Sequence, residues 1–284
     1  LMDARSIAAT TANGGILTPA TDIDYDPTVP EYHYDASSYD TRVYQGFGHS
    51  DYDALLKFGP NIKDWPEIAP LGENLLLKVA SFITDPVTTT DELIPSGETS
   101  SYRSNPLGLA EFTLSRKDPA YVGRAKAVQA EEAARRAGNG DAALLEQLHA
   151  VPGCKNLSWA DVQLASTLFA VKPGDGSARE QAASCQRVLG AGANIVNEYA
   201  TKRYRSNLIN WGMLPFQLDG TAPFGLGDYI FIPNVRRVLK GDLKHIPAYV
   251  LGKEPKAFAL YMAPLTDDER QILADGCLIN FYKR

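Results

Sequence analysis

The apolar positions of the chain alternate between continuous strand-like runs and segments with a helical period. Residues 75–82 and 162–172 form two apolar runs that predict buried strands, and the second run ends at Pro173-Gly174. Residues 178–189 then predict a helix that ends at Gly190. Shorter elements are predicted further along: strands at 195–196, 229–232, 248–251 and 258–262, a helix at 199–209 and an extended segment at 213–216. Because strands and helices alternate here, the pattern predicts an α/β layer.

The helix signals divide the rest of the chain. Residues 4–11 have apolar positions at helical spacing before Asn13-Gly14-Gly15, a typical helix end. A helical segment near 124–154 is split at Gly138 to Asp141, and Asp141 is placed to cap its second helix. A final helix is predicted after Thr266, where Glu269 completes a capping box.

These signals predict three regions. We expect residues 1–20 to be the tail of a preceding domain that lies outside this chain. Residues 21–66 are acidic and aromatic, too aromatic for a disordered tether, so we expect an ordered interdomain linker lying across a surface. Residues 67–284 then form the main domain.

Composition and charge exclude several classes of protein. No stretch approaches the roughly 20 apolar residues that span a bilayer, and the first residues lack the pattern of a secretory signal, so we expect a cytoplasmic protein without a membrane partner. The net charge of -6 argues against nucleic acid as a partner. Three widely separated cysteines predict free thiols with packing roles: Cys154, Cys185 and Cys277. The four histidines are isolated and are typical of surface or interface positions.

The run Gly174-Asp175-Gly176-Ser177-Ala178-Arg179-Glu180 lies where a predicted strand turns into a helix. Free backbone N–H groups and the positive end of a helix bind anions, and an arginine in the first turn can grip a carboxylate in a two-point fork. A capped helix start with a surface arginine fits the local pattern equally well. Similarly, Lys202-Arg203-Tyr204-Arg205 could contact phosphate, but a solvated helix face or a patch that meets other domains fits the run better.

Three ordered motifs resemble the aconitase and isopropylmalate isomerase superfamily. The run at Gly174, continued through Gln181-Ala182-Ala183, resembles the family signature Gly-x-Gly-Ser-Ser-Arg-Glu-His-Ala. Downstream, Ser206-Asn207-Leu208 and Gly212-Met213-Leu214-Pro215-Phe216 resemble the family's Asn-Leu and Gly-Leu-Leu-Pro-Leu run. Upstream, the segment from Thr89 to Gly97 is similar to Thr-Thr-Asp-His-Ile-Ser. The resemblance implies a swivelling β/β/α domain like the aconitase C-terminal domain, with the helical segment near 124–154 as an insertion.

The resemblance also implies roles for residues of this chain. Ser177 matches the serine that acts as catalytic base, and Arg103 and Arg179 match arginines that hold substrate carboxylates. Asp91 matches an active-site aspartate with a supporting role, and Ala178 stands at a substrate-binding position where the family has a second serine. Read locally, Arg103 is also typical of a solvated loop arginine and Asp91 of a turn residue.

Several positions depart from the family pattern. Ala178 and Gln181 replace a serine and a histidine, and Glu92 and Ile94 replace the histidine and serine of the upstream motif. The family's 4Fe-4S cluster is ligated by a Cys-x-x-Cys arrangement and a third cysteine, which this chain lacks, so we expect the cluster in the missing N-terminal domains.

The sequence therefore predicts part of a hydro-lyase that acts on a hydroxylated di- or tricarboxylic acid, in which this chain alone is inactive. Two alternatives remain open. One is a catalytically silent relative that senses a carboxylate or an RNA. The other is a separate small subunit, against which the helix at residues 4–11 argues.

Overall fold

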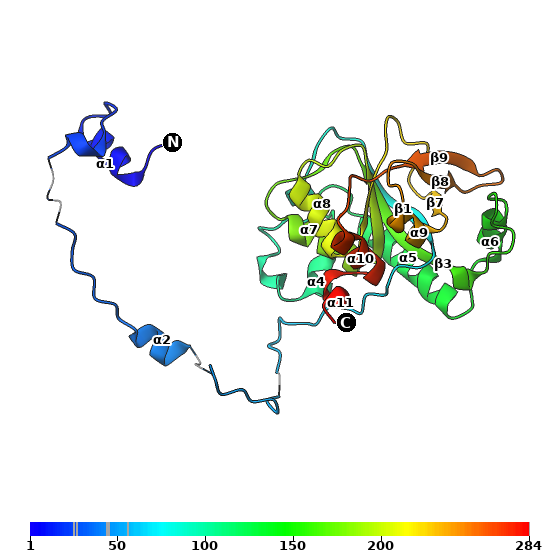
Figure 1. Cartoon of the computed structure of the whole chain (residues 1–284), viewed down its shortest axis with the longest axis horizontal. Helices are drawn as coiled ribbons and strands as arrows, with labels where there is room; N and C mark the ends of the chain where they lie inside the picture. The colour runs from blue at the N-terminus through cyan, green and yellow to red at the C-terminus, as the bar shows by residue number, and fades with distance from the viewer. Residues whose placement is uncertain (25, 27, 44–45, 56, 284) are drawn as a thin grey trace. The chain divides into compact units, whose positions relative to one another are not determined.

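The computed structural model describes residues 1–24, 26, 28–43, 46–55 and 57–283. The chain divides into two compact units, Leu1–Leu56 and Lys57–Arg284 (Figure 1). Part of the predicted linker, at positions 25, 27, 44–45 and 56, lies outside the described residues.

The first unit contains short helices. The predicted opening helix is confirmed as α1 (Ala4–Ala12), and the Asp3 side chain caps it by accepting hydrogen bonds from the amides of Arg5 and Ser6. A 3₁₀ turn, η1 (Ala20–Asp22), and a short helix, α2 (Ser37–Arg42), follow. The assignment of residues 1–20 to a preceding domain and of 21–66 to a linker stays a prediction.

The second unit is built on a seven-stranded mixed sheet (Figure 1). Its strand order is β6-β5-β3-β1-β7-β8-β9. Neighbours from β6 to β1 pair in parallel, whereas β7, β8 and β9 continue the sheet in antiparallel pairs. The strands are β1 (Asn74–Ile83), β3 (Val162–Ala170), β5 (Ala191–Val196), β6 (Leu214–Gln217), β7 (Tyr229–Ile232), β8 (Ile246–Val250) and β9 (Lys256–Leu260). The predicted α/β fold class and its strand-rich C-terminal part are confirmed.

Two helices of this unit begin where the sequence predicts caps. Asp141 accepts hydrogen bonds from the amides of Ala143 and Leu144, and Thr266 and Glu269 form the predicted capping box. The helices are α3 (Thr90–Leu93), α4 (Pro106–Ala110), α5 (Tyr121–Arg136), α6 (Ala142–His149), α7 (Arg179–Val188), α8 (Lys202–Asn210), α9 (Val235–Lys240), α10 (Asp267–Asp275) and α11 (Leu278–Phe281), with 3₁₀ turns η2 (Ser100–Tyr102) and η3 (Trp159–Asp161). Among the described residues, no helix is both long and apolar enough to cross a membrane.

The sheet has a hydrophobic core on each face. Leu75 and Leu77 of β1 belong to the cluster that includes apolar side chains of α9 and α10. Leu76 packs with α5 and α6, and Ala80 packs with α4, α5, α7 and α8. This alternation is expected for a strand buried on both faces. It fixes α7, which carries the candidate site at its first turn, against the middle of the sheet.

Candidate functional site

The upstream motif and the run at Gly174 meet in a small second sheet. Its two strands, β2 (Thr88–Thr89) and β4 (Pro173–Asp175), pair in parallel, with Thr88 opposite Pro173 and Thr89 opposite Asp175. The Thr88 amide also donates to the Lys172 carbonyl at 3.0 Å. Two segments that are far apart in the sequence are thereby joined, and α3 and α7 begin side by side at the ends of these strands.

Two glycines allow this close packing. A Cβ at Gly174 would lie 2.4 Å from the Tyr204 ring, and a Cβ at Gly176 would lie 2.2 Å from Oγ1 of Thr90. Both residues also have positive φ angles, +98° and +131°, which residues other than glycine rarely adopt. The loop before Ser177 is therefore fixed between α3 and α8.

Ser177 lies directly before the uncapped start of α7. Ala178 is the N-cap residue and offers no side-chain hydrogen bond to the helix, whereas most helices have a capping side chain at this position. The first N–H groups of a helix have no partner within it, and the helix dipole adds positive potential there. The exposed Ser177 hydroxyl is therefore set beside donors that favour an anion.

A cavity of about 220 Å³ opens on one side of Ser177. Its walls bring together three of the predicted site residues, Arg103, Ser177 and Ala178. The other lining residues are Ile94, Ser96, Thr99, Leu109 and Gln181. The lining therefore combines apolar side chains with a guanidinium and several hydroxyl or amide groups.

Ser177 also lines a second cavity, of about 380 Å³. Arg179 lies in its wall together with Lys202 and Arg203 of α8, so the cavity is rich in positive charge. The remaining lining residues are Glu180, Ser206 and Asn207. The Arg179 guanidinium donates one hydrogen bond to the Gly176 carbonyl, and Glu180 accepts a hydrogen bond from the Trp211 indole at 3.0 Å. Ser177 is thus shared by two cavities that each contain at least one arginine.

Asp91 lines neither of these cavities. Its carboxylate pairs with Arg116 at 2.6 Å and accepts a hydrogen bond from the Ser96 amide at 3.2 Å. Arg116 also pairs with Glu98, and these two carboxylates raise the pKa of the guanidinium, with Glu98 contributing more. Asp91 therefore holds the turn that carries Ser96, which is a supporting position outside the cavity.

The residues that depart from the family pattern lie in different parts of the site. Glu92 turns back onto Thr89 in a capping box at α3 and pairs with Lys117 at 3.1 Å. Burial alone would raise the pKa of Glu92, but hydrogen bonds from Thr89 and Lys117 outweigh it and lower the pKa. Ile94 and Gln181 line the smaller cavity, so these two exchanges change the surface that a ligand would contact.

Sequence reasoning did not identify several lining residues. Ser96 lies inside the upstream motif that signalled the site, whereas the buried Thr99 carried no local signal. The basic run is predicted to form a solvated helix face or a patch that meets other domains; Lys202 and Arg203 are exposed, and both also line the larger cavity. Tyr204 instead lies in the core, where its hydroxyl accepts hydrogen bonds from Gln186 and Asn194, each at 2.9 Å.

The described residues do not fit an iron-sulfur cluster. No group of three or more histidine, cysteine, aspartate or glutamate side chains in this part of the chain is placed to hold a metal ion. The cysteines are buried free thiols, and Cys154 and Cys185 belong to different hydrophobic clusters. Burial raises the pKa of both these thiols, which favours the neutral form.

Comparison with known families gives one match, and it falls on the segment from η3 to just beyond β6. Residues 159–221 match the aconitase C-terminal domain family. This aconitase-type segment contains β4, Ser177, α7, α8 and the Gly212 run, and it confirms the predicted resemblance to the superfamily there. The match covers less than a quarter of the chain. It begins after the segment that contains Asp91 and Arg103 and does not include it.

The chain is also similar to solved structures. One of them is a 3-isopropylmalate dehydratase from Methanocaldococcus jannaschii, with 21% sequence identity and a TM-score of 0.42. The alignment covers 73% of this chain and 93% of that chain. No curated protein matches the chain in sequence.

Proposed function

We propose that this chain supplies one half of the active site of an aconitase-like hydro-lyase. The substrate would be a hydroxylated di- or tricarboxylic acid that loses water, and the other half of the site would lie in cluster-bearing domains outside this chain. The observation that carries the proposal is the position of Ser177, which lies in the aconitase-type segment and lines two cavities that each contain an arginine.

Ser177 is the group assigned to remove a proton from the substrate carbon. A serine hydroxyl is a weak base, so its alkoxide needs stabilisation by neighbouring donors. The uncapped first turn of α7, Arg179 and the cations of α8 supply positive potential on the side of the larger cavity. These groups support the assignment because they favour the ionised form of the hydroxyl.

Arg103 and Arg179 are assigned to bind substrate carboxylates. They line different cavities, and Ser177 lines both, which suits a substrate with two carboxylates near the reacting carbon. Each guanidinium can form a two-point hydrogen bond with a carboxylate, and two such contacts would fix the substrate carbon relative to the serine.

The cluster belongs to the proposed partner domains. When bound, it would supply a Lewis acid for the departing hydroxyl group. The described residues of this chain do not ligate it, so their proposed work is limited to substrate binding, orientation and proton removal.

The test is a comparison of Ser177→Ala with the unaltered enzyme in the intact protein that includes the cluster-bearing domains. We expect turnover to fall by at least about a hundredfold, the lower range for loss of a general base, while the visible spectrum of the cluster is unchanged. Ser115→Ala is the matched control, because Ser115 is only partly buried and lines neither cavity. Unaltered turnover by Ser177→Ala would remove the base assignment.

A second candidate function is supported by the changed wall of the smaller cavity. Ile94, Ala178 and Gln181 stand where the resembled family has serine, serine and histidine, so polar groups are lost while Arg103 remains. A catalytically silent relative that binds a carboxylate would need the cation and not the full polar shell. Calorimetry of the intact protein with citrate and isopropylmalate, combined with ultraviolet absorbance of unsaturated acids, separates the two: a sensor binds an acid without forming an unsaturated product.

A further inference from the structure

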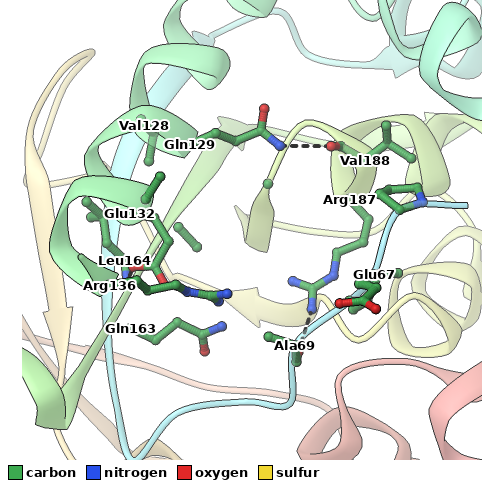
Figure 2. Close-up of a pocket in the computed structure, with 15 residues that line it drawn as sticks. Glu67, Ala69, Val128, Gln129, Glu132, Arg136, Gln163, Leu164, Arg187 and Val188 are labelled. Carbon is green, nitrogen blue, oxygen red and sulfur yellow. Dashed lines mark hydrogen bonds and ion pairs between the residues drawn. The ribbon is translucent and has the colours of Figure 1, made fainter.

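A third cavity, of about 250 Å³, lies at the opposite end of α7 from Ser177 (Figure 2). Its walls come from α5, from β3, from the last turn of α7 and from the segment at residues 66–69. The volume is far above the roughly 15 Å³ that one water needs. None of its lining residues is shared with the cavities beside Ser177.

Arg187 extends into this cavity without a carboxylate partner. Its guanidinium donates only to carbonyl groups: to Ala191 at 3.0 Å, to Gly276 at 3.2 Å and to Ala69 at 3.4 Å. No described acidic side chain lies within ion-pair distance of it, since none of the ion pairs includes Arg187. Burial lowers the pKa of Arg187 to about 10, so the group remains charged at neutral pH. A charge in this position is costly unless something compensates for it.

Arg136 faces Arg187 across the cavity. Figure 2 shows the two guanidinium groups pointing toward one another from α5 and α7. Each of the two charges disfavours the other, because Arg136 also contributes to the lowered pKa of Arg187. Arg136 uses its Nε atom to bind Glu132 at 2.7 Å, which leaves its terminal nitrogens directed at the cavity.

The nearby carboxylates do not neutralise this pair. Glu132 is already bound by Arg135, Arg136 and the Leu164 amide. Glu67 lines the cavity but is exposed and forms no ion pair with either arginine. The cavity is lined by two arginines (Arg136 and Arg187) and two glutamates (Glu67 and Glu132). Because Glu132 also binds Arg135, which lies outside the lining, it does not fully neutralise Arg136, and Arg187 has no carboxylate partner among the described residues.

We propose that this cavity binds a small oxyanion with two negative charges, held between the guanidinium groups of Arg136 and Arg187. Two arginines that converge on one cavity are the arrangement that binds phosphate or a dicarboxylate through charge-assisted hydrogen bonds. Inorganic phosphate and succinate present this same chemistry, and they form the two arms of the test. The site is separate from the one proposed beside Ser177, so it stands or falls independently of the hydro-lyase function.

The test is isothermal titration calorimetry of the whole chain with inorganic phosphate and, separately, with succinate in a low-chloride buffer. We expect one equivalent of at least one of the two oxyanions to bind. Arg136→Gln should weaken this binding at least tenfold, because it removes one of the two cations. Lys126→Gln, on the exposed side of α5 and paired with Glu111, is the matched control and should bind within twofold of the unaltered chain.

Two further variants locate the binding. The double variant Arg103→Gln/Arg179→Gln disables the site proposed beside Ser177 and should leave this binding unchanged. Arg187→Gln should abolish it, but this variant also loses three carbonyl contacts that stabilise the fold, so Arg136→Gln is the deciding variant. Absence of binding by the unaltered chain to both oxyanions overturns the proposal. So does binding that survives Arg136→Gln or is lost in the double variant.

Discussion

Gly212 provides the sharpest test of how the helix ends of the second unit pack. The residue follows the last turn of α8, where the Gly212 amide donates to the Ile209 carbonyl and the Met213 amide donates to the Leu208 carbonyl. This is the Schellman pattern, which requires a left-handed residue, and Gly212 has a φ of +68°. A Cβ here would lie 1.7 Å from the Gly276 carbonyl oxygen at the end of α10.

Gly212→Ala lowers the free energy of unfolding through two contributions. The left-handed conformation costs an alanine about 1–2 kcal/mol. The contact with Gly276 is between backbone atoms, so the ends of α8 and α10 would have to separate by roughly 1 Å or more, and overpacking of this kind costs about 1–3 kcal/mol. We expect a total loss of about 2–5 kcal/mol in the free energy of unfolding.

Urea denaturation followed by tryptophan fluorescence measures this loss. Trp211 precedes Gly212 and packs against Trp65 in a tilted arrangement with ring centroids 4.3 Å apart, so the signal reports on the altered site. Gly220→Ala is the matched control, because Gly220 has a φ of +73° and no atom within 4 Å of an added Cβ. The control should lose only about 1–2 kcal/mol, the cost of the conformation. Equal losses for the two variants would refute the packing of α8 against α10.

Three further outcomes follow from buried groups. Burial alone would raise the pKa of Glu132, but hydrogen bonds from Arg135, Arg136 and the Leu164 amide outweigh it and lower the pKa. The stability that Glu132 contributes is therefore present above its ordinary pKa of 4.5 and is lost as pH falls through the lower pKa of the folded state. The difference in urea midpoint between the unaltered chain and Glu132→Gln should therefore shrink below about pH 4.5. A difference independent of pH would contradict this. Tyr204→Phe should cost about 1–3 kcal/mol because one buried N–H of Gln186 and one of Asn194 lose their acceptor, although Gln186 keeps its bond to the Ala182 carbonyl. Tyr199→Phe, whose hydroxyl has only a 3.5 Å contact, should cost less in the same assay. The three buried cysteines should react with a thiol reagent such as dithionitrobenzoate only after denaturation, and rapid labelling of the native chain would show that the cores around them are open.

Much of the fold is predictable from local signals. The apolar runs at 75–82 and 162–172 correspond to β1 and β3, and the caps at Asp141 and Thr266 mark the starts of α6 and α10. Both kinds of signal depend only on neighbouring residues, since a strand needs a continuous apolar run and a cap needs one side chain at a fixed spacing.

The candidate site depends on contacts that local signals do not contain. Residues 86–91 predict a break, yet Thr88 and Thr89 form a strand because they pair with Pro173 to Asp175. The basic run at 202–205 divides by helical periodicity: Lys202 and Arg203 line a cavity, and Tyr204 enters the core. The motifs identified the segments, and the tertiary contacts between them, which are the pairing of β2 with β4 and the packing of α4 on α7, place Arg103 and Ser177 on one cavity.

The most direct test of the central claim is exchange of a substrate C–H proton with solvent deuterium. The intact protein, including the cluster-bearing domains, is incubated in D₂O with citrate or isopropylmalate, and loss of the C–H signal is followed by proton NMR. The account predicts exchange by the unaltered protein and a loss of at least about a hundredfold in Ser177→Ala, because no other group is assigned to remove that proton. Exchange by Ser177→Ala at the unaltered rate would contradict the role of Ser177. Absence of exchange in the unaltered protein would contradict the hydro-lyase function itself.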